Sequence, residues 1–296
     1  MRIGSLFSGI GGLELGLERG LHTAGIAAEV VYQVERSAFC RHILARHWPG
    51  ATRFDDVCSV GVAVLPTVDL LCGGFPCQDV SSAGRGAGLN GARSGLWWEF
   101  ARIIEETRPR WVVVENVASG ARRWLPAVRR ALGARGYDSL PVGISASEVG
   151  ARHRRERVFV VASNAVGCGR LAWHIERDSD AGRRESARGA VADAVRAGLP
   201  HGQRERDDLG PTTCATPERD AGAVVPWEGM PARPWMVRGV HGLPGGVDGP
   251  WKRAGWTPAR VREARIRALG NCVVPAQVEP IGRLIASFEQ SSIRSG

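Results

Sequence analysis

Short apolar runs alternate with helix-like spacing over the first 163 residues of the chain. The runs predict buried strands at 2–7, 28–34, 68–72, 111–114 and 158–162. Between them, apolar positions at helical spacing predict helices at 13–19 and 97–106. Strands separated by helices are typical of an α/β domain with a mostly parallel sheet, which is the fold class that we expect.

The pattern changes after residue 163 and returns near the end of the chain. Residues 164–262 are rich in Arg, Gly, Asp and Pro and show little periodicity, which predicts a small, loop-rich domain or a long insertion. From Arg265 onward the apolar spacing resumes, and it predicts a helix at 276–288. We therefore divide the chain into residues 1–163, 164–262 and 263–296.

Unusual residues follow four of the predicted strands. They are a glycine turn at 7–12, Glu35, the pair Pro76-Cys77 and the pair Glu115-Asn116. In open α/β sheets the carboxyl ends of the strands form the ligand crevice. The sequence therefore predicts a functional site at this edge of the sheet.

The glycine turn is a candidate for binding a nucleoside-type cofactor. Its glycines allow a close approach of backbone to ligand, and it opens the helix predicted at 13–19. Glu35 ends the next strand, the position at which an acid binds ribose hydroxyls. The third glycine of a dinucleotide fingerprint is missing. An ordinary strand–helix turn, with Glu35 as a solvated charge, is therefore the alternative.

Cys77 is the candidate nucleophile, because it lies in a glycine-rich turn where a thiol is presented rather than packed. A carboxyl group such as Glu115 beside it can serve as a general acid or hydrogen-bond partner. The alternatives are a spectator thiol at Cys77 and a Glu115 that caps a helix or pairs with Arg110. Arg155 and Arg157 share one face if their segment is extended, and two such arginines can grip a phosphate or a base oxygen. A basic edge strand is the alternative for this pair.

The chain has a formal net charge of +9, and Lys252 is its only lysine. Such an excess of arginine suits a polyanionic partner, although a GC-rich genome also favours arginine over lysine. The seven cysteines match no zinc spacing, so we expect reduced thiols, no metal and a cytoplasmic location. We find no signal-peptide pattern and no apolar run of membrane-spanning length, and expect no membrane partner.

These residues carry a resemblance to a known family. In chain order the motifs are Phe7-x-Gly9-x-Gly11-Gly12, Gly74-Phe75-Pro76-Cys77-Gln78, Glu115-Asn116-Val117, Arg155-x-Arg157 and Gly270-Asn271-x-Val273-x-Pro275. As an ordered set they resemble those of the DNA (cytosine-5)-methyltransferases. The resemblance implies a Rossmann-like S-adenosylmethionine-dependent methyltransferase sheet in 1–163 and a small, loop-rich target-recognition domain in 164–262. The segment 263–296 would return to the catalytic domain.

The resemblance also implies a reaction and its catalytic residues, which are Cys77, Glu115, Asn116, Arg155 and Arg157. The Cys77 thiolate would add to carbon 6 of a cytosine flipped out of the duplex, so that carbon 5 can take a methyl group from S-adenosylmethionine. Glu115 would hydrogen-bond ring nitrogen 3 and the exocyclic amine. Asn116 would support the site, and the two arginines would hold the base or its phosphate.

The family pattern implies the binding residues as well. Those of the cofactor pocket are Phe7, Ser8, Gly9, Gly11, Glu35, Asp56, Val57, Pro76, Leu96, Asn271 and Val273. Glu35 would bind the ribose, and Asp56 (with Asp55 as its alternative) and Val57 would lie near the adenine. The candidate DNA contacts are Gln78, Ser81, Arg233 and Arg238. Arg152 and His153 depart from the proline and glutamine common in the family.

The resemblance implies a monomer that acts on double-stranded DNA. It would serve a restriction–modification system, with a cognate endonuclease as a separate protein, or protect a phage or mobile element. An RNA cytosine-5 methyltransferase is one alternative, since one RNA-methylating branch shares these motifs. A catalytically silent DNA-binding protein is the other, and the intact catalytic set argues against it.

Overall fold

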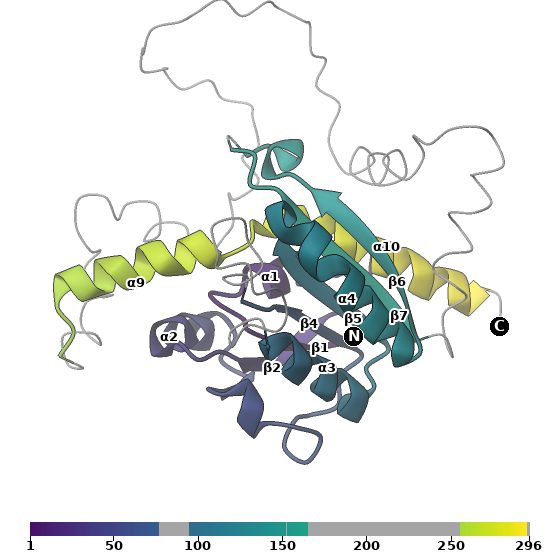
Figure 1. Cartoon of the computed structure of the whole chain (residues 1–296), viewed down its shortest axis with the longest axis horizontal. Helices are drawn as coiled ribbons and strands as arrows, with labels where there is room; N and C mark the ends of the chain where they lie inside the picture. Colours follow the sequence, from purple (N-terminus) through teal and green to yellow (C-terminus); the bar gives the residue numbers. More distant parts are fainter. Residues whose placement is uncertain (77–94, 152, 165–254, 295–296) are drawn as a thin grey trace, which may run out of the picture.

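The computed structural model describes residues 1–76, 95–151, 153–164 and 255–294 (Figure 1). Its centre is a seven-stranded sheet with the strand order β3-β2-β1-β4-β5-β7-β6. The strands are β1 (Arg2–Leu6), β2 (Glu29–Val34), β3 (Thr52–Phe54), β4 (Leu70–Gly74), β5 (Trp111–Val117), β6 (Tyr137–Ile144) and β7 (Arg157–Asn164). The first five strands in this order, β3, β2, β1, β4 and β5, pair in parallel. β7 is antiparallel to both β5 and β6. The predicted α/β class with a mostly parallel sheet is confirmed.

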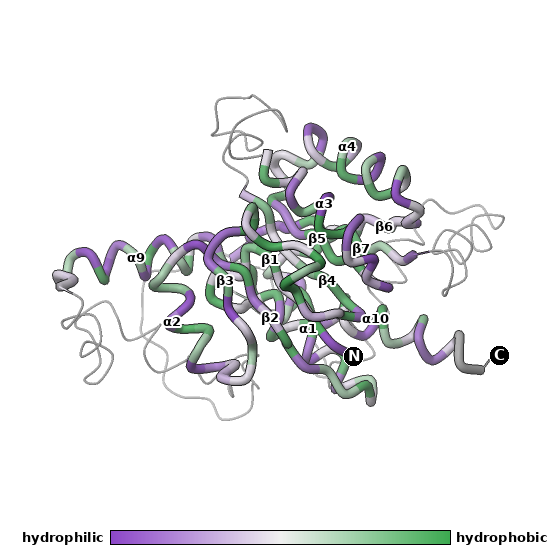
Figure 2. The backbone as a smooth tube through the Cα atoms, turned by 90° about the horizontal axis from the view of Figure 1, so that it is seen from below, coloured by the Kyte–Doolittle hydropathy of each residue, from purple (hydrophilic) through white to green (hydrophobic). Residues whose placement is uncertain are grey.

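Helices cover both faces of this sheet. The α-helices are α1 (Gly12–Thr23), α2 (Ala38–His47), α3 (Leu96–Thr107), α4 (Ala121–Ala134), α9 (Pro258–Asn271) and α10 (Pro275–Arg294), and the short 3₁₀ turns are η1 (Val57–Ser59), η3 (Ala118–Gly120) and η4 (Ala146–Val149). Side chains of α1 and α10 pack on one face and those of α3 and α4 on the other. Figure 2 shows apolar residues concentrated in the sheet, whereas polar and apolar residues alternate along α4 and α9.

All five predicted strands and all three predicted helices are present, with shifted ends. The helix predicted at 13–19 extends over Gly12–Thr23, and β5 continues through Val117. Glu115 and Asn116 therefore lie within the last residues of β5 rather than after it. The elements α2, β3, α4, β6 and α9 were not predicted. No helix in the described ranges is both long and apolar enough to cross a membrane.

The last helix is packed against the first one with their backbones in contact. A Cβ atom at Gly16 would lie 2.4 Å from the carbonyl oxygen of Pro275, and one at Gly20 would lie 2.2 Å from that of Glu279. Only glycine allows such an approach. The C-terminal segment thus returns to the N-terminal half, where α10 lies beside α1 (Figure 1).

The strand order reverses between β1 and β4, because β2 and β3 lie on one side of β1 and the later strands lie on the other. At such a switch point the loops that leave the carboxyl ends of the strands diverge and open a crevice. The predicted glycine turn, Glu35, Pro76 and Glu115 follow or end β1, β2, β4 and β5. The sheet therefore brings these residues to one edge.

Candidate active site

The turn between β1 and α1 has the backbone of a ligand-binding loop. Phe7, Gly9 and Gly11 have φ angles of 57°, 56° and 85°, in the left-handed region that favours glycine. A Cβ atom at Gly9 would meet nothing within 4 Å, whereas one at Gly11 would collide with the ring of Trp48. The Ser8 hydroxyl is buried and donates to Ser5. The open space at Gly9, next to the amino end of α1, suits a polar group of a ligand.

Glu35 is bound to this turn. Its Oε2 accepts a hydrogen bond from the N–H of Gly9 at 2.8 Å, and its Oε1 accepts one from the N–H of Ser37 at 2.7 Å. Burial raises the pKa of Glu35, while the two N–H groups and the charge of Arg41 oppose the rise. The Glu35 carboxylate therefore joins the end of β2 to the glycine turn.

The segment after β3 contains the two residues predicted near an adenine. Asp56 is exposed, and its Oδ1 accepts the N–H of Cys58 at 3.0 Å and so caps η1. The Val57 side chain is buried in the core beneath this segment. Arg102 of α3 holds the backbone in place, because its Nη2 donates to the carbonyls of Val57 at 3.2 Å and Val60 at 2.9 Å. This role of Arg102 has no signal in the sequence.

Glu115 of β5 and Arg157 of β7 form an ion pair. The distance from Arg157 Nε to Glu115 Oε1 is 2.8 Å, and the two side chains are 11% and 13% exposed. Burial raises the pKa of Glu115 to about 7, and the positive charges of Arg157 and Arg155 oppose the rise. A carboxyl group with this pKa is protonated in much of the population at neutral pH, so it can donate a hydrogen bond as well as accept one.

Two neighbouring residues make room for Glu115 and hold the backbone beside it. Gly74 pairs with Glu115 across β4 and β5, and a Cβ atom at Gly74 would lie 2.5 Å from Glu115 Oε2. Asn116 is buried, and its Nδ2 donates to the carbonyl of Phe75 at 3.2 Å. The end of β5 thus anchors the chain where it leaves β4 toward Pro76. The need for glycine at position 74 follows only from this register.

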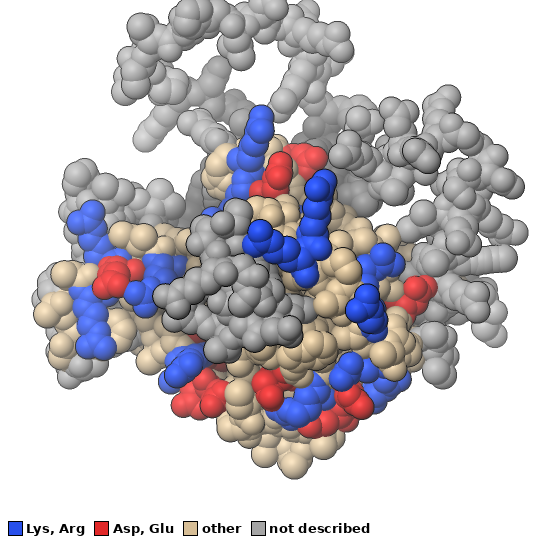
Figure 3. All heavy atoms as spheres, viewed as in Figure 1, with Lys and Arg blue, Asp and Glu red and all other residues tan. Residues whose placement is uncertain are grey.

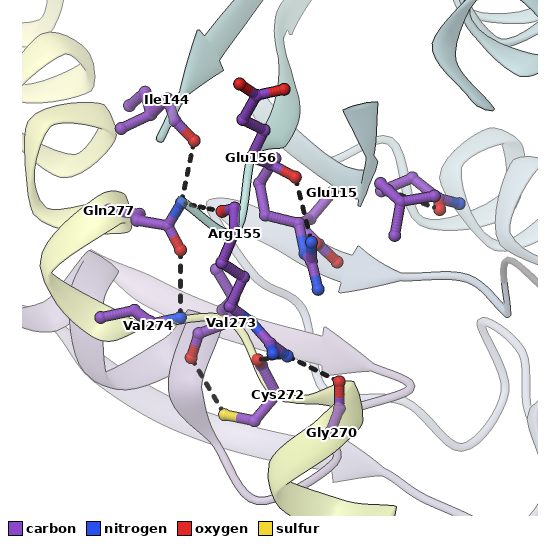
Figure 4. A network of polar contacts seen from close by, with 12 residues as sticks. Glu115, Ile144, Arg155, Glu156, Gly270, Cys272, Val273, Val274 and Gln277 are labelled. Atoms are coloured by element: carbon purple, nitrogen blue, oxygen red, sulfur yellow. Dashed lines mark hydrogen bonds and ion pairs between the residues drawn. The ribbon is translucent and has the colours of Figure 1, made fainter. Parts of the chain in front are cut away.

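Arg155 does not follow the extended geometry considered for its segment. Its φ angle is 33°, which is left-handed, so the alternation that would place Arg155 and Arg157 on one face is wrong here. Arg155 Nη2 instead donates to the carbonyls of Leu269, Gly270 and Cys272 at 3.3, 2.6 and 2.5 Å (Figure 4). The last carbonyls of a helix lack intrahelical donors, so this guanidinium caps the end of α9.

The segment that joins α9 to α10 lies against the glycine turn. A Cβ atom at Gly12 would lie 2.5 Å from both Cys272 Sγ and the carbonyl oxygen of Val273. Val273 is buried, and Asn271 is exposed at the end of α9. On the other side, Leu96 begins α3 and packs on the core. Cys272 and Val273, near the C-terminus, therefore lie against the start of α1, near the N-terminus.

Several predicted site residues lie outside the described part of the chain. They are Cys77, Gln78, Ser81, Arg233 and Arg238. The residue Arg152 and most of the region 164–262 lie outside it too. The roles predicted for these residues, and the division of the chain into three parts, stay predictions.

Comparison with known proteins gives one family. The family profile described as C-5 cytosine-specific DNA methylase matches residues 1–169. The chain is 36% identical over 171 residues to the Type II methyltransferase M2.BsuMI of Bacillus subtilis (strain 168), covering 55% of this chain and 42% of that protein. It is 30% identical over 165 residues to M.HhaI of Haemophilus parahaemolyticus, covering 54% and 48%.

A longer match includes the C-terminal segment. The chain is 31% identical over 266 residues to the Type II methyltransferase M.PspPI of Psychrobacter sp. (strain TA137), covering 85% of this chain and 60% of that protein. The chain spans about half the length of the curated relatives that it matches.

Proposed function

The chain belongs to the family of C-5 cytosine-specific DNA methylases, and from this membership and the geometry of the site we propose that it transfers a methyl group from S-adenosylmethionine to carbon 5 of cytosine in double-stranded DNA. The observation that carries the proposal is the buried pair of Glu115 and Arg157, whose Oε1 and Nε atoms are 2.8 Å apart. Asn116, which follows Glu115 in β5, donates to the carbonyl of Phe75, two residues before Cys77 in the sequence. The acid candidate Glu115 thus pairs with the end of β4, the strand that precedes the candidate nucleophile Cys77 in the sequence.

Each residue has a defined chemical role in this proposal. Carbon 5 of cytosine is too electron-poor to attack a methyl donor, so the Cys77 thiolate first forms a bond to carbon 6. The electron pair of the 5,6 double bond is then delocalised over carbon 5 and, through carbon 4, over nitrogen 3. The protonated Glu115 donates to nitrogen 3, and Arg157 stabilises the carboxylate charge that develops. Transfer of the methyl group to carbon 5 would leave S-adenosylhomocysteine. Carbon 5 then loses its proton to solvent, the bond to sulfur breaks, the thiolate leaves, and nitrogen 3 returns its proton to Glu115.

The cofactor would occupy the crevice at the ends of β1 and β2. S-adenosylmethionine supplies the electrophilic methyl group when it is bound. The space at Gly9 and the start of α1 fit its polar groups, and the remaining lone pairs of Glu35 suit its ribose hydroxyls. Asp56 is exposed after β3 and would face the adenine. Asn271 and Val273 would close the pocket from the C-terminal segment.

Double-stranded DNA is the proposed partner, and charge supports this choice. The chain has a formal net charge of +9, and basic side chains gather over α9 (Figure 3). Arg260, Arg262 and Arg267 of this helix are exposed, with Glu263 among them. We assign target recognition to residues 164–262, with Arg233 and Arg238 as candidate contacts. The named relatives are Type II methyltransferases, so we propose that the protein protects DNA from a restriction enzyme.

Trapping of the covalent intermediate tests the proposal. Fluorine at carbon 5 of cytosine replaces the hydrogen that is lost as a proton in the last step, so this step is blocked. After methyl transfer, duplex DNA that carries 5-fluorocytosine should therefore stay covalently bound to Cys77. We expect a covalent protein–DNA complex that requires S-adenosylmethionine, and none with Cys77→Ala, whose cofactor affinity should stay near that of the wild type. If a folded wild-type chain shows no covalent complex and no methyl transfer to duplex DNA, the proposal is refuted. Transfer to tRNA alone would favour the RNA methyltransferase.

A further inference from the structure

Gln277 joins three backbone segments behind the pair of Glu115 and Arg157. It lies in the first turn of α10 and is fully buried. Its Nε2 donates to the carbonyls of Ile144 at 2.8 Å and Arg155 at 2.9 Å, and its Oε1 accepts the N–H of Val274 at 3.4 Å (Figure 4). A single side chain thus connects the end of β6, the turn before β7 and the start of α10.

The turn before β7 needs such support. Arg155 has a left-handed backbone, which is unfavourable for a residue with a Cβ atom and persists only where its surroundings enforce it. Its carbonyl is held by Gln277, and its guanidinium is held by the carbonyls at the end of α9. One residue earlier, the carbonyl of Arg154 accepts the N–H of Ala146 at 2.7 Å. Each of these bonds restrains the backbone of the turn.

The turn leads directly into the start of β7, where Arg157 lies. Arg157 is the first residue of β7 and follows Arg155 by two positions. A rotation of the backbone at Arg155 would displace the guanidinium that meets Glu115. We propose that Gln277 is a positioning residue of the catalytic site, which holds the left-handed turn at Arg155 and so directs Arg157 toward Glu115. This inference rests on the proposed function, in which Glu115 contacts the cytosine and Arg157 stabilises the charge of Glu115.

A purely structural role would have different consequences. If Gln277 only attached α10 to the sheet, its loss would lower stability and leave the folded protein equally active. The same helix offers a matched control in Gln290, whose Nε2 donates to the carbonyl of Ala24 at 2.7 Å, at the end of α1. Gln277→Leu and Gln290→Leu remove the same chemical group from one helix, and only the first touches the turn.

We expect Gln277→Leu to lower kcat for methyl transfer by about tenfold to a hundredfold, because small displacements in a catalytic site have effects of this size. The KM for S-adenosylmethionine should change by less than about threefold. Val274 follows the proposed cofactor residue Val273, and its hydrogen bond with Gln277, at 3.4 Å, is the longest and weakest of the three that Gln277 makes. Gln290→Leu should keep the wild-type kcat. Gln277→Glu has the same size and, when ionised, offers no donor to the two carbonyls, so it should lose kcat as well.

The pH profile provides a second signature. The charged groups that face Glu115 are Arg157 and Arg155, and the thiol of Cys272 lies within reach of its charge. Both arginines lower the pKa of Glu115, so loosening Arg157 should raise it. In Gln277→Leu the limb of the pH–rate profile that reports Glu115 should move to higher pH. In Gln290→Leu it should stay where it is in the wild type.

A crystal structure of Gln277→Leu separates this inference from the proposed function. We expect Arg157 Nε to leave its position 2.8 Å from Glu115 Oε1. An unchanged pair in that structure overturns the inference, whether or not the wild type methylates DNA. Equal losses of kcat in Gln277→Leu and Gln290→Leu would overturn it too. A wild type without activity would refute the proposed function alone.

Discussion

Gly20 lies where the backbones of α1 and α10 touch, and Gly20→Ala tests how closely these helices are packed. The added Cβ atom would lie 2.2 Å from the carbonyl oxygen of Glu279 and 2.9 Å from the Cα atom of Gly282. Both neighbours are backbone atoms, which cannot turn aside as a side chain can. Ordinary contact begins near 3.4 Å, so the helices would have to separate by about 1 Å.

The size of the effect follows from two opposing contributions. Forcing a group into a packed interior typically costs about 1–3 kcal/mol, and alanine is better than glycine in a helix by about 1 kcal/mol. Because the obstacle is backbone, we expect the upper part of the first range and a net loss of roughly 2 kcal/mol in the free energy of unfolding. Gly133 in α4 is the matched control, since a Cβ atom there would meet nothing within 4 Å.

Urea unfolding measured by circular dichroism compares the two variants. Gly133→Ala should be more stable than the wild type by about 0.5–1 kcal/mol, through the smaller entropy of its unfolded chain. Gly20→Ala should be less stable, so the two identical substitutions should have opposite signs. If Gly20→Ala also stabilises the protein, the close packing of α1 on α10 is wrong.

Two further predictions concern buried carboxyl groups. Burial raises the pKa of Glu14 from 4.5 to about 7. Between these two pH values the native state keeps a proton that the unfolded state releases. The free energy of unfolding therefore falls by roughly 3 kcal/mol as the pH rises from 4.5 through 7. Glu14→Gln cannot ionise and should exceed the wild type by about that amount at pH 8, but by much less at pH 5; equal stabilities at pH 8 would contradict this reasoning. Glu35→Ala loses the acceptor of the Gly9 and Ser37 N–H groups, and its Kd for S-adenosylmethionine should rise on the order of tenfold in calorimetry. An unchanged Kd would exclude Glu35 from the cofactor site.

The central strands could be predicted because they are buried on both faces and appear as continuous apolar runs. β5 is an example, since Trp111–Val114 is fully buried. β3 has three residues at the edge of the sheet, and β6 is an edge strand that contains Pro141, so neither gives such a run. α4 contains Pro126, which is typical of a helix boundary rather than an interior.

The candidate site could be predicted in part for a similar reason. Parallel strands bring their carboxyl ends to one edge, so the sequence predicts the glycine turn, Glu35 and Glu115 at the edge where β1, β2 and β5 end. The contacts of Arg155 could not be predicted, because its left-handed backbone replaces an extended one and its partner Leu269 is 114 residues away. Gln277 had no signal, since its role depends on two carbonyls that only the fold brings together.

Single-base methylation sequencing tests the central claim most directly. A methylation-free bacterial host would express the wild-type chain or Cys77→Ala, and both its DNA and its tRNA would be sequenced. We predict new 5-methylcytosine at one short DNA sequence with the wild type and none with the variant. The absence of methylation from DNA, with a folded wild-type protein in the cell, would contradict the account.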